Sequence, residues 1–278
     1  MCDIVEYFIS SKKANQEQCE DALILTSRYI GVADGASGSG EIFIGSKTCG
    51  KWISEAISVA FSALSLDEPI PDVLEYINDY ICGMYRNESI YDFLESSVMG
   101  RPCATMAFCD LANREVVMVG DCQCIVNGRL YVTEGRLEKV LAEIRSVINA
   151  NLLTSGYALN HIIERDLGRE YIMPILQNRK IFQNATVKSE FVYYAVDGFA
   201  VPPEGVIKIK INEGPGDVVL ATDGYPKIYN TLDQSEKYLA DLLTEDPLCI
   251  EKYKSTKGLS VGGNSFDDRA YVKIHFKS

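Results

Sequence analysis

Short apolar runs that end at acidic turns recur along the chain. Residues 29–34 form one such run, rich in β-branched side chains, and Asp34-Gly35 closes it before a Gly/Ser-rich segment. The run DVVLATDG, at 217–224, repeats this pattern, and FDDRAYVKIHF, at 266–276, opens with two aspartates. Continuous apolar runs bounded by Gly and Asp predict buried strands. We therefore expect three strands that each present a carboxylate at one end.

Further runs of the same kind predict more strands, at 3–9, 22–25, 190–196 and 205–211. The close spacing of 22–25 and 29–34 predicts an antiparallel pair. Residues 101–128 contain three runs separated by short breaks, which predicts a meander. Runs that are apolar on both faces indicate strands covered on both sides, so we expect a sandwich of sheets with helices outside it.

Two long segments carry apolar residues at helical spacing, 41–66 and 71–94, and their stripes are typical of a core-facing helix. Residues 131–188 are harder to place, and we interpret them as an insertion or lid beside the sheets. The patterns predict further helices at 137–153, 157–167, 234–243 and 247–253, and irregular backbone at 174–184. Because we find no repeat and no low-complexity linker, we expect residues 1–278 to form a single domain.

Charge and composition narrow the class of protein. The chain has 278 residues, of which 47% are hydrophobic, and a net charge of -12 from 27 basic and 39 acidic residues. An acidic chain without a Lys/Arg-rich block is a poor partner for nucleic acid or an anionic membrane. No stretch approaches the roughly 20 apolar residues of a membrane span, and the start of the chain does not resemble a signal peptide. We expect a cytoplasmic protein, a monomer by default, whose nine cysteines are reduced.

The acidic strand ends are the main candidate chemistry. Carboxylates brought to one place repel one another unless a divalent cation lies between them, and an all-oxygen ligand set suits Mg²⁺ or Mn²⁺ far better than Zn²⁺. An Asp-Gly pair after a strand is also an ordinary turn signal. Each aspartate alone is therefore open to both interpretations, and the case for a metal site rests on their number.

The ordered motifs carry a family resemblance from residue 20 to residue 275. They are Glu20-Asp21, Val32-Ala33-Asp34-Gly35, Cys103-Ala104-Thr105, Val119-Gly120-Asp121-Cys122, Ala221-Thr222-Asp223-Gly224 and Asp267-Asp268. This series resembles the signature series of the metal-dependent serine/threonine protein phosphatases, the type 2C or PPM family, in its bacterial form. The resemblance implies an α+β fold of two antiparallel sheets packed as a sandwich with helices on the outer faces, in four layers (αββα). It also implies two Mn²⁺ or Mg²⁺ ions at one end of the sandwich, with a third ion possible.

The resemblance also implies an activity and a set of site residues. The activity is hydrolysis of phosphoserine and phosphothreonine in proteins by a hydroxide held between the ions, without a phosphoenzyme. The implied roles are a bridging ligand at Asp34, a carbonyl ligand at Gly35, ligands of the second ion at Asp223 and Asp267, holders of metal-bound water at Glu20 and Asp21, and a ligand of a third ion at Asp121. Asp34, Asp223 and Asp267 would be the catalytic set.

Two departures from the family pattern keep other functions open. Ala36 stands where animal members often have a histidine, and Gln16 stands where the family usually has a phosphate-binding arginine. Lys12 or Lys13 could substitute, although a lysine does not grip phosphate bidentately. Lys227 also takes the place of a further acidic ligand. One alternative is therefore an inactive, type 2C-like pseudophosphatase that binds a phosphorylated partner or serves as a regulatory module. Another is a small-molecule phosphate hydrolase whose pocket is shaped by residues 131–188.

Overall fold

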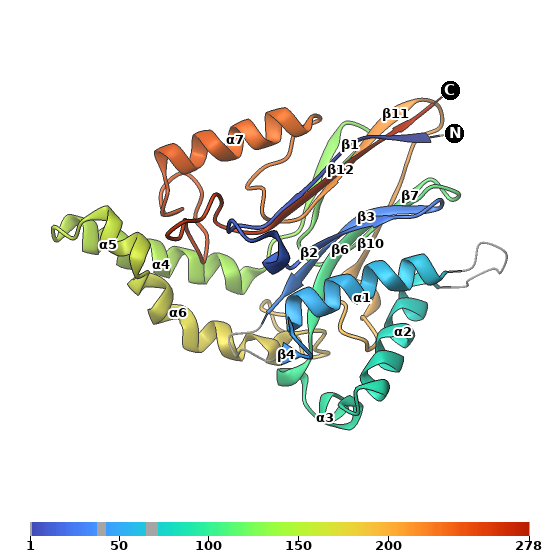
Figure 1. Cartoon of the computed structure of the whole chain (residues 1–278), viewed down its shortest axis with the longest axis horizontal. Helices are drawn as coiled ribbons and strands as arrows, with labels where there is room; N and C mark the ends of the chain where they lie inside the picture. The colour runs from blue at the N-terminus through green and yellow to red at the C-terminus, as the bar shows by residue number, and fades with distance from the viewer. Residues whose placement is uncertain (1, 38–42, 65–71, 278) are drawn as a thin grey trace.

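The computed structural model describes residues 2–37, 43–64 and 72–277, which form two antiparallel five-stranded sheets packed face to face (Figure 1). The first sheet has the strand order β1-β12-β11-β8-β9, and the second has the order β10-β7-β6-β3-β2. The strands are β1 (Cys2–Ser10), β2 (Asp21–Leu25), β3 (Tyr29–Ala36), β6 (Cys103–Asp110), β7 (Glu115–Val119), β8 (Gln123–Val126), β9 (Arg129–Val132), β10 (Val206–Lys210), β11 (Gly216–Ala221) and β12 (Arg269–Phe276). The expected sandwich is confirmed, as is the antiparallel pairing of β2 with β3.

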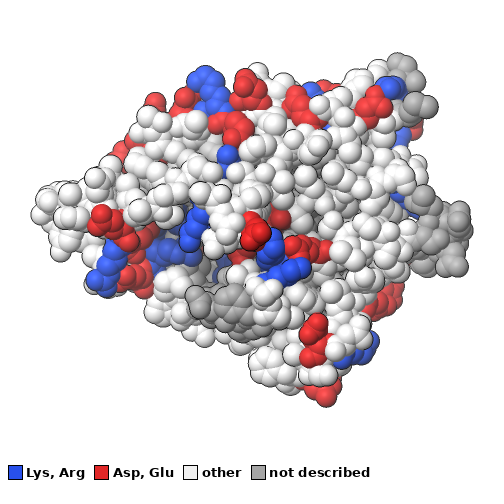
Figure 2. All heavy atoms as spheres, viewed as in Figure 1, with Lys and Arg blue, Asp and Glu red and all other residues white. Residues whose placement is uncertain are grey.

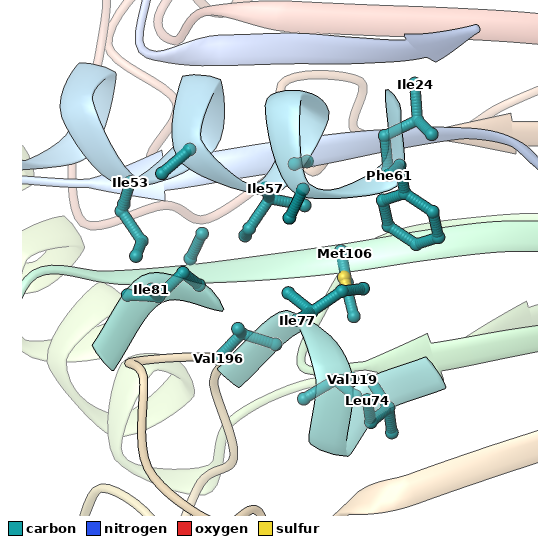
Figure 3. Close-up of a cluster of buried hydrophobic side chains, with 14 of the residues drawn as sticks. Ile24, Ile53, Ile57, Phe61, Leu74, Ile77, Ile81, Met106, Val119 and Val196 are labelled. Carbon is teal, nitrogen blue, oxygen red and sulfur yellow. The ribbon is translucent and has the colours of Figure 1, made fainter. Parts of the chain in front are cut away.

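Helices cover both outer faces of the sandwich and complete four layers. Helices α1 (Cys49–Ala63) and α2 (Val73–Asn87) pack on the second sheet, and α7 (Leu232–Glu245) packs on the first. Figure 3 shows side chains of α1 and α2, among them Ile57 and Ile77, gathered around Met106 of β6. A separate apolar layer lies between the sheets, with Val32 and Met118 from one side and Leu220 and Val272 from the other. The two-sided strands predicted from the sequence are therefore buried on both faces.

The predicted bounds of the two long helices were wrong, although parts of them (41–42, 65–66 and 71) lie outside the described residues. The first helix begins at Cys49, because a short hairpin of β4 (Phe43–Ile44) and β5 (Lys47–Thr48) precedes it and the Thr48 side chain caps it by accepting from the Lys51 N–H. The second helix ends at Asn87. Ser89 has a φ of 58°, which breaks the helix, and a separate helix α3 (Tyr91–Ser96) follows.

The predicted meander was also wrong. β6 and β7 are neighbours in the second sheet, but β8 belongs to the first, so the chain crosses between the sheets at Gly120-Asp121-Cys122. Gly120 has a φ of 85°, and a Cβ there would lie 2.2 Å from the Thr105 Cγ2. This sharp crossing therefore requires glycine, and it carries Asp121 to the end of the sandwich where both sheets meet.

The region 131–188 is mostly helical and lies beside the sheets (Figure 1). It contains α4 (Arg136–Thr154), α5 (Leu159–Glu164), α6 (Leu167–Asn178) and the short 3₁₀ helix η3 (Arg179–Phe182). The helix expected at 137–153 is confirmed, whereas α5 is shorter than the expected 157–167. The irregular backbone expected at 174–184 was wrong for its first part, because α6 continues through Pro174 to Asn178 although this proline cannot donate to the helix ladder.

Two further predicted elements are not regular structure. Residues 190–196 make single bridges, Gln183 with Tyr193 and Ala104 with Val196, and form no strand. Residues 247–253 form turns rather than a helix. None of the helices within the described ranges is long and apolar enough to cross a membrane.

Candidate metal centre

Three carboxylates from different parts of the sequence meet at one end of the sandwich. Asp34 lies near the end of β3, Asp121 on the crossing after β7, and Asp223 just after β11. One oxygen of each lies within 4.8 Å of the others. Each strand delivers its aspartate to the same end, so the grouping follows from the topology of the two sheets.

These carboxylates hold protons more tightly than an isolated aspartate does. Enclosure at the end of the sandwich, followed by the charges of Asp21 and Asp223, raises the pKa of Asp34 well above its usual range. Enclosure and the Asp223 charge likewise raise the pKa of Asp121 to about 6. Mutual repulsion of this kind favours a bound cation that would offset it.

Asp21 lies beside this group and is more deeply buried. Burial, followed by the charge of Asp268, raises the pKa of Asp21 to about 8, although the Thr222 hydroxyl donates a 2.7 Å hydrogen bond to its Oδ2. Within the described part of the chain, the Asp21 Oδ1 and Asp223 Oδ1 atoms are buried without any hydrogen-bond partner. Unpaired carboxylate oxygens in a cluster of this charge are a donor set that fits Mg²⁺ or Mn²⁺.

Gly35 lies beside Asp34 in the last residues of β3, and Glu20 lies next to it just before the start of β2. A Cβ on Gly35 would lie 1.9 Å from the Gly50 carbonyl oxygen at the start of α1, so only glycine permits this approach. The Gly35 N–H donates to the Glu20 carbonyl at 3.1 Å. The Glu20 carboxylate accepts hydrogen bonds from the hydroxyls of Thr48, at 2.5 Å, and Ser37. Glu20 thus ties the turn after β3 to the start of α1.

Asp267 does not join the three-carboxylate group in the described structure. Its Oδ1 accepts from the Lys12 Nζ at 3.2 Å, and its Oδ2 pairs with the Lys257 Nζ. Its neighbour Asp268 accepts from the backbone N–H of Lys12 at 2.8 Å and of Glu20 at 3.1 Å. Asp267 therefore lies beside the three-carboxylate group and contacts two lysine ammonium groups. Asp268 holds the two loops that border the three-carboxylate group.

The other candidate residues from the sequence have contacts of their own. The Gln16 Oε1 accepts from the Ser11 N–H at 3.0 Å, so this side chain supports the loop that carries Lys12. Lys13 forms a backbone bridge with Gly263, and Lys227 is exposed and lies over the Tyr229 ring. Lys227 is thus directed to an aromatic ring rather than to the carboxylates.

Sequence reasoning missed Lys257. Partial burial and the nearby Lys12 ammonium lower the pKa of Lys257 to about 8, while the charges of Asp223 and Asp34 act in the opposite direction. A single lysine before a glycine-rich stretch has no pattern that would single it out.

Figure 2 shows basic and acidic side chains side by side near the middle of the visible face.

Comparisons with known proteins find similarity at the level of solved structures. No protein-family model matches the chain, and no curated protein matches it. The solved structures include the serine/threonine phosphatase PstP/Ppp of Mycobacterium tuberculosis (16% identity, 99% of this chain and 100% of that chain, TM-score 0.47). They also include Stp1 of Staphylococcus aureus (14% identity, 100% of this chain and 96% of that chain, TM-score 0.49). A third is a PstP catalytic domain in complex with two manganese ions (15% identity, 100% of each chain, TM-score 0.48).

At these identities the comparison bears on the fold alone.

Proposed function

We propose that this protein is a Mn²⁺- or Mg²⁺-dependent phosphatase that hydrolyses phosphoserine and phosphothreonine in proteins. The observation that supports it most is the group of Asp34, Asp121 and Asp223, whose oxygens lie within 4.8 Å of one another. The unpaired, buried oxygens of Asp21 and Asp223 add to it. Carboxylates crowded in this way are poorly stable by themselves and gain most from divalent cations.

In this proposal Asp34, Asp121 and Asp223 would hold the ions, with the Gly35 carbonyl and Asp267 as further ligands. Such ions, when bound, neutralise charge on phosphoryl oxygens and lower the pKa of an attacking water. Glu20 and Asp21 would orient water at the edge of the centre. The chain's own task is to hold these carboxylates close together, and Asp267 would exchange its contacts with Lys12 and Lys257 for an ion.

The cysteine next to the centre does not serve as a nucleophile. Cys122 is fully buried between the sheets, and its Sγ lies 3.5 Å from the Thr105 hydroxyl. Burial raises the pKa of this thiol well above its usual range, so it stays protonated and unreactive at neutral pH. An inert Cys122 agrees with the proposed attack by water rather than by a thiolate.

A pseudophosphatase is the second candidate, and one observation favours it. Gln16 stands at the position where the family usually has a phosphate-binding arginine. Its side-chain oxygen accepts a hydrogen bond from the Ser11 N–H and is thereby directed to the backbone of its own loop. With Ala36 in place of a histidine, the protein would then bind a phosphorylated partner without cleaving it. The third candidate, a small-molecule phosphate hydrolase, differs from the first only in substrate size.

The experiment is hydrolysis of p-nitrophenyl phosphate and of a phosphothreonine peptide, with and without Mn²⁺, by wild type and Asp223→Asn. Asp217→Asn is a matched control, because Asp217 lies on the same strand, β11, but pairs with Lys273 and His275 away from the centre. We expect Mn²⁺-dependent turnover in wild type and Asp217→Asn and none in Asp223→Asn. A folded wild type that binds the peptide but never cleaves it would favour the pseudophosphatase. Cleavage of p-nitrophenyl phosphate but not of the peptide would favour a small substrate.

A further inference from the structure

Residues 246–258 form a loop beside the metal centre that several buried groups hold in one shape. The buried Asp246 carboxylate accepts from the backbone N–H groups of Ile250 at 3.1 Å, Glu251 at 2.8 Å and Lys252 at 2.9 Å. These bonds form a compact turn where the sequence predicted a helix. The first half of the loop is therefore rigid.

The second half of the loop is held by two arginines from the inserted helices. Arg145 of α4 has no exposed surface, and its guanidinium donates to the carbonyls of Leu248 at 2.8 Å and Ser255 at 2.9 Å, with Asp166 as its counterion. Arg169 of α6 donates to the Thr256 carbonyl at 2.6 Å. Both carbonyls that precede Lys257 in the chain are thus fixed.

Gly258, on the other side of Lys257, is equally constrained. A Cβ at this position would lie 2.6 Å from the Leu248 carbonyl oxygen and 2.8 Å from the Arg145 Nη2. Only glycine allows the chain to pass so close to the buried guanidinium. The backbone of Lys257 is therefore held on both of its sides. Ordering the loop in this way costs conformational entropy, which a binding role of the Lys257 side chain would offset.

The Lys257 side chain extends from this support to the edge of the carboxylate group. Its ammonium pairs with Asp267, on the oxygen opposite the one that Lys12 contacts, and its side chain stays 32% exposed while that of Lys12 is 30% exposed. Asp34 and Asp223 both lie within electrostatic range of this ammonium. Lys257 is therefore both close to the centre and open to an arriving molecule.

A phosphate ester carries two negative charges, and the structure provides no arginine at the position of Gln16 to receive them. If Asp267 turned to a divalent cation, Lys257 would lose its counterion and would gain most from a new anion at this place. We propose that Lys257, assisted by Lys12, binds the phosphoryl group of the substrate, and that Arg145 and Arg169 of the inserted helices are positioning residues for it. The binding role rests on the proposed function for its substrate, a phosphate monoester, but it can be measured without turnover.

The test is calorimetric binding of inorganic phosphate to the full chain saturated with Mg²⁺. Lys257→Gln should weaken phosphate binding by about 10- to 100-fold, the effect of losing one charge-assisted hydrogen bond. Lys257→Arg, which keeps the charge, should restore most of the affinity. Lys254→Gln is the matched control, because Lys254 lies in the same loop but pairs with Glu143 at the surface, and it should bind phosphate like wild type.

Two further measurements separate a binding role from a structural one. Mg²⁺ affinity should not fall in Lys257→Gln, because the substitution frees Asp267 from a competing ammonium, and the thermal midpoint should change little. In active protein KM should rise while kcat falls much less. Arg145→Lys, which keeps the charge but not all the hydrogen bonds to the loop, should weaken phosphate binding in the same direction.

The outcomes distinguish this inference from the proposed function. Phosphate binding that depends on Lys257 in a protein without turnover would support the inference and overturn the phosphatase activity. Equal phosphate affinity in wild type and a folded Lys257→Gln would overturn the inference. If Lys257→Gln also turned over substrate with an unchanged KM, the phosphatase activity would stand without a role for Lys257.

Discussion

Asp21 on β2 lies directly opposite Asp34 on β3 in the antiparallel register. Two acidic side chains are thereby placed across one strand pair at the end of the sandwich, where Asp121 and Asp223 add further charge. An arrangement that concentrates like charge in this way lowers the stability of the metal-free protein. The predictions below follow from this pairing and from the loops around it.

The metal-free protein should lose stability as the pH rises. The pKa of Asp21 is raised to about 8 and that of Asp121 to about 6, from 3.8 in each case, so in this range the folded state binds more protons than the unfolded state. The free energy of unfolding therefore falls between about pH 4 and about pH 8 as these groups ionise. Urea denaturation in a chelator at several pH values measures it. Asp21→Asn should flatten the dependence, and an equally steep fall in that variant would contradict the assignment.

Divalent cations should stabilise the fold by an amount that rises with the logarithm of their concentration above the dissociation constant. At a Mn²⁺ concentration one hundred times the dissociation constant, the free energy of unfolding should rise by about 2.7 kcal/mol. Thermal denaturation with and without Mn²⁺ measures this gain. Asp34→Asn should abolish most of the gain from Mn²⁺. A gain that survived in Asp34→Asn would place the ions elsewhere.

Gly35→Ala should prevent normal folding. The new Cβ would lie 1.9 Å from the Gly50 carbonyl oxygen, and neither backbone can move without displacing β3 from α1. We expect a loss of more than about 4 kcal/mol in the free energy of unfolding. Gly83→Ala is the control, because a Cβ in that turn of α2 meets nothing within 4 Å; it should be neutral or stabilise the helix by up to about 1 kcal/mol. Chemical denaturation of both variants settles the comparison.

Arg145→Met should loosen the loop 246–258 from the rest of the fold. The change removes the donor to three loop carbonyls and leaves Asp166 without its buried partner, at a cost of about 3–5 kcal/mol. Amide hydrogen exchange should become faster across 248–257. Arg165→Met is the matched control, because Arg165 forms a solvent-exposed pair with Glu170, and its loss should change the free energy of unfolding and the exchange of the loop little. Unchanged exchange in the loop of Arg145→Met would show that Asp246 alone holds it.

Local patterns placed Asp223 correctly, because the apolar run of β11 stops at Ala221 and Asp223-Gly224 forms a turn just after it. The same signal was wrong for Asp34-Gly35, because β3 continues through both residues to Ala36, where pairing with β6 holds the backbone extended. The helix predicted at 137–153 was correct as α4, although its position beside the sheets could not be placed from the sequence. The strand at 190–196 failed because β propensity requires a partner strand, and this segment finds only single bridges.

Long-range placement decided the rest of the site. The strand order carries β8 into the opposite sheet, and that crossing brings Asp121 beside Asp34 and Asp223 although the intervals between them in the chain are long. Lys257 reaches Asp267 only because two arginines from the inserted helices hold its loop. A turn signal such as Asp223-Gly224 depends on neighbours in the chain, so it could be read from the amino-acid sequence. The charges that meet at the site depend on how the two sheets and helices α4 and α6 pack, so they became known from the fold.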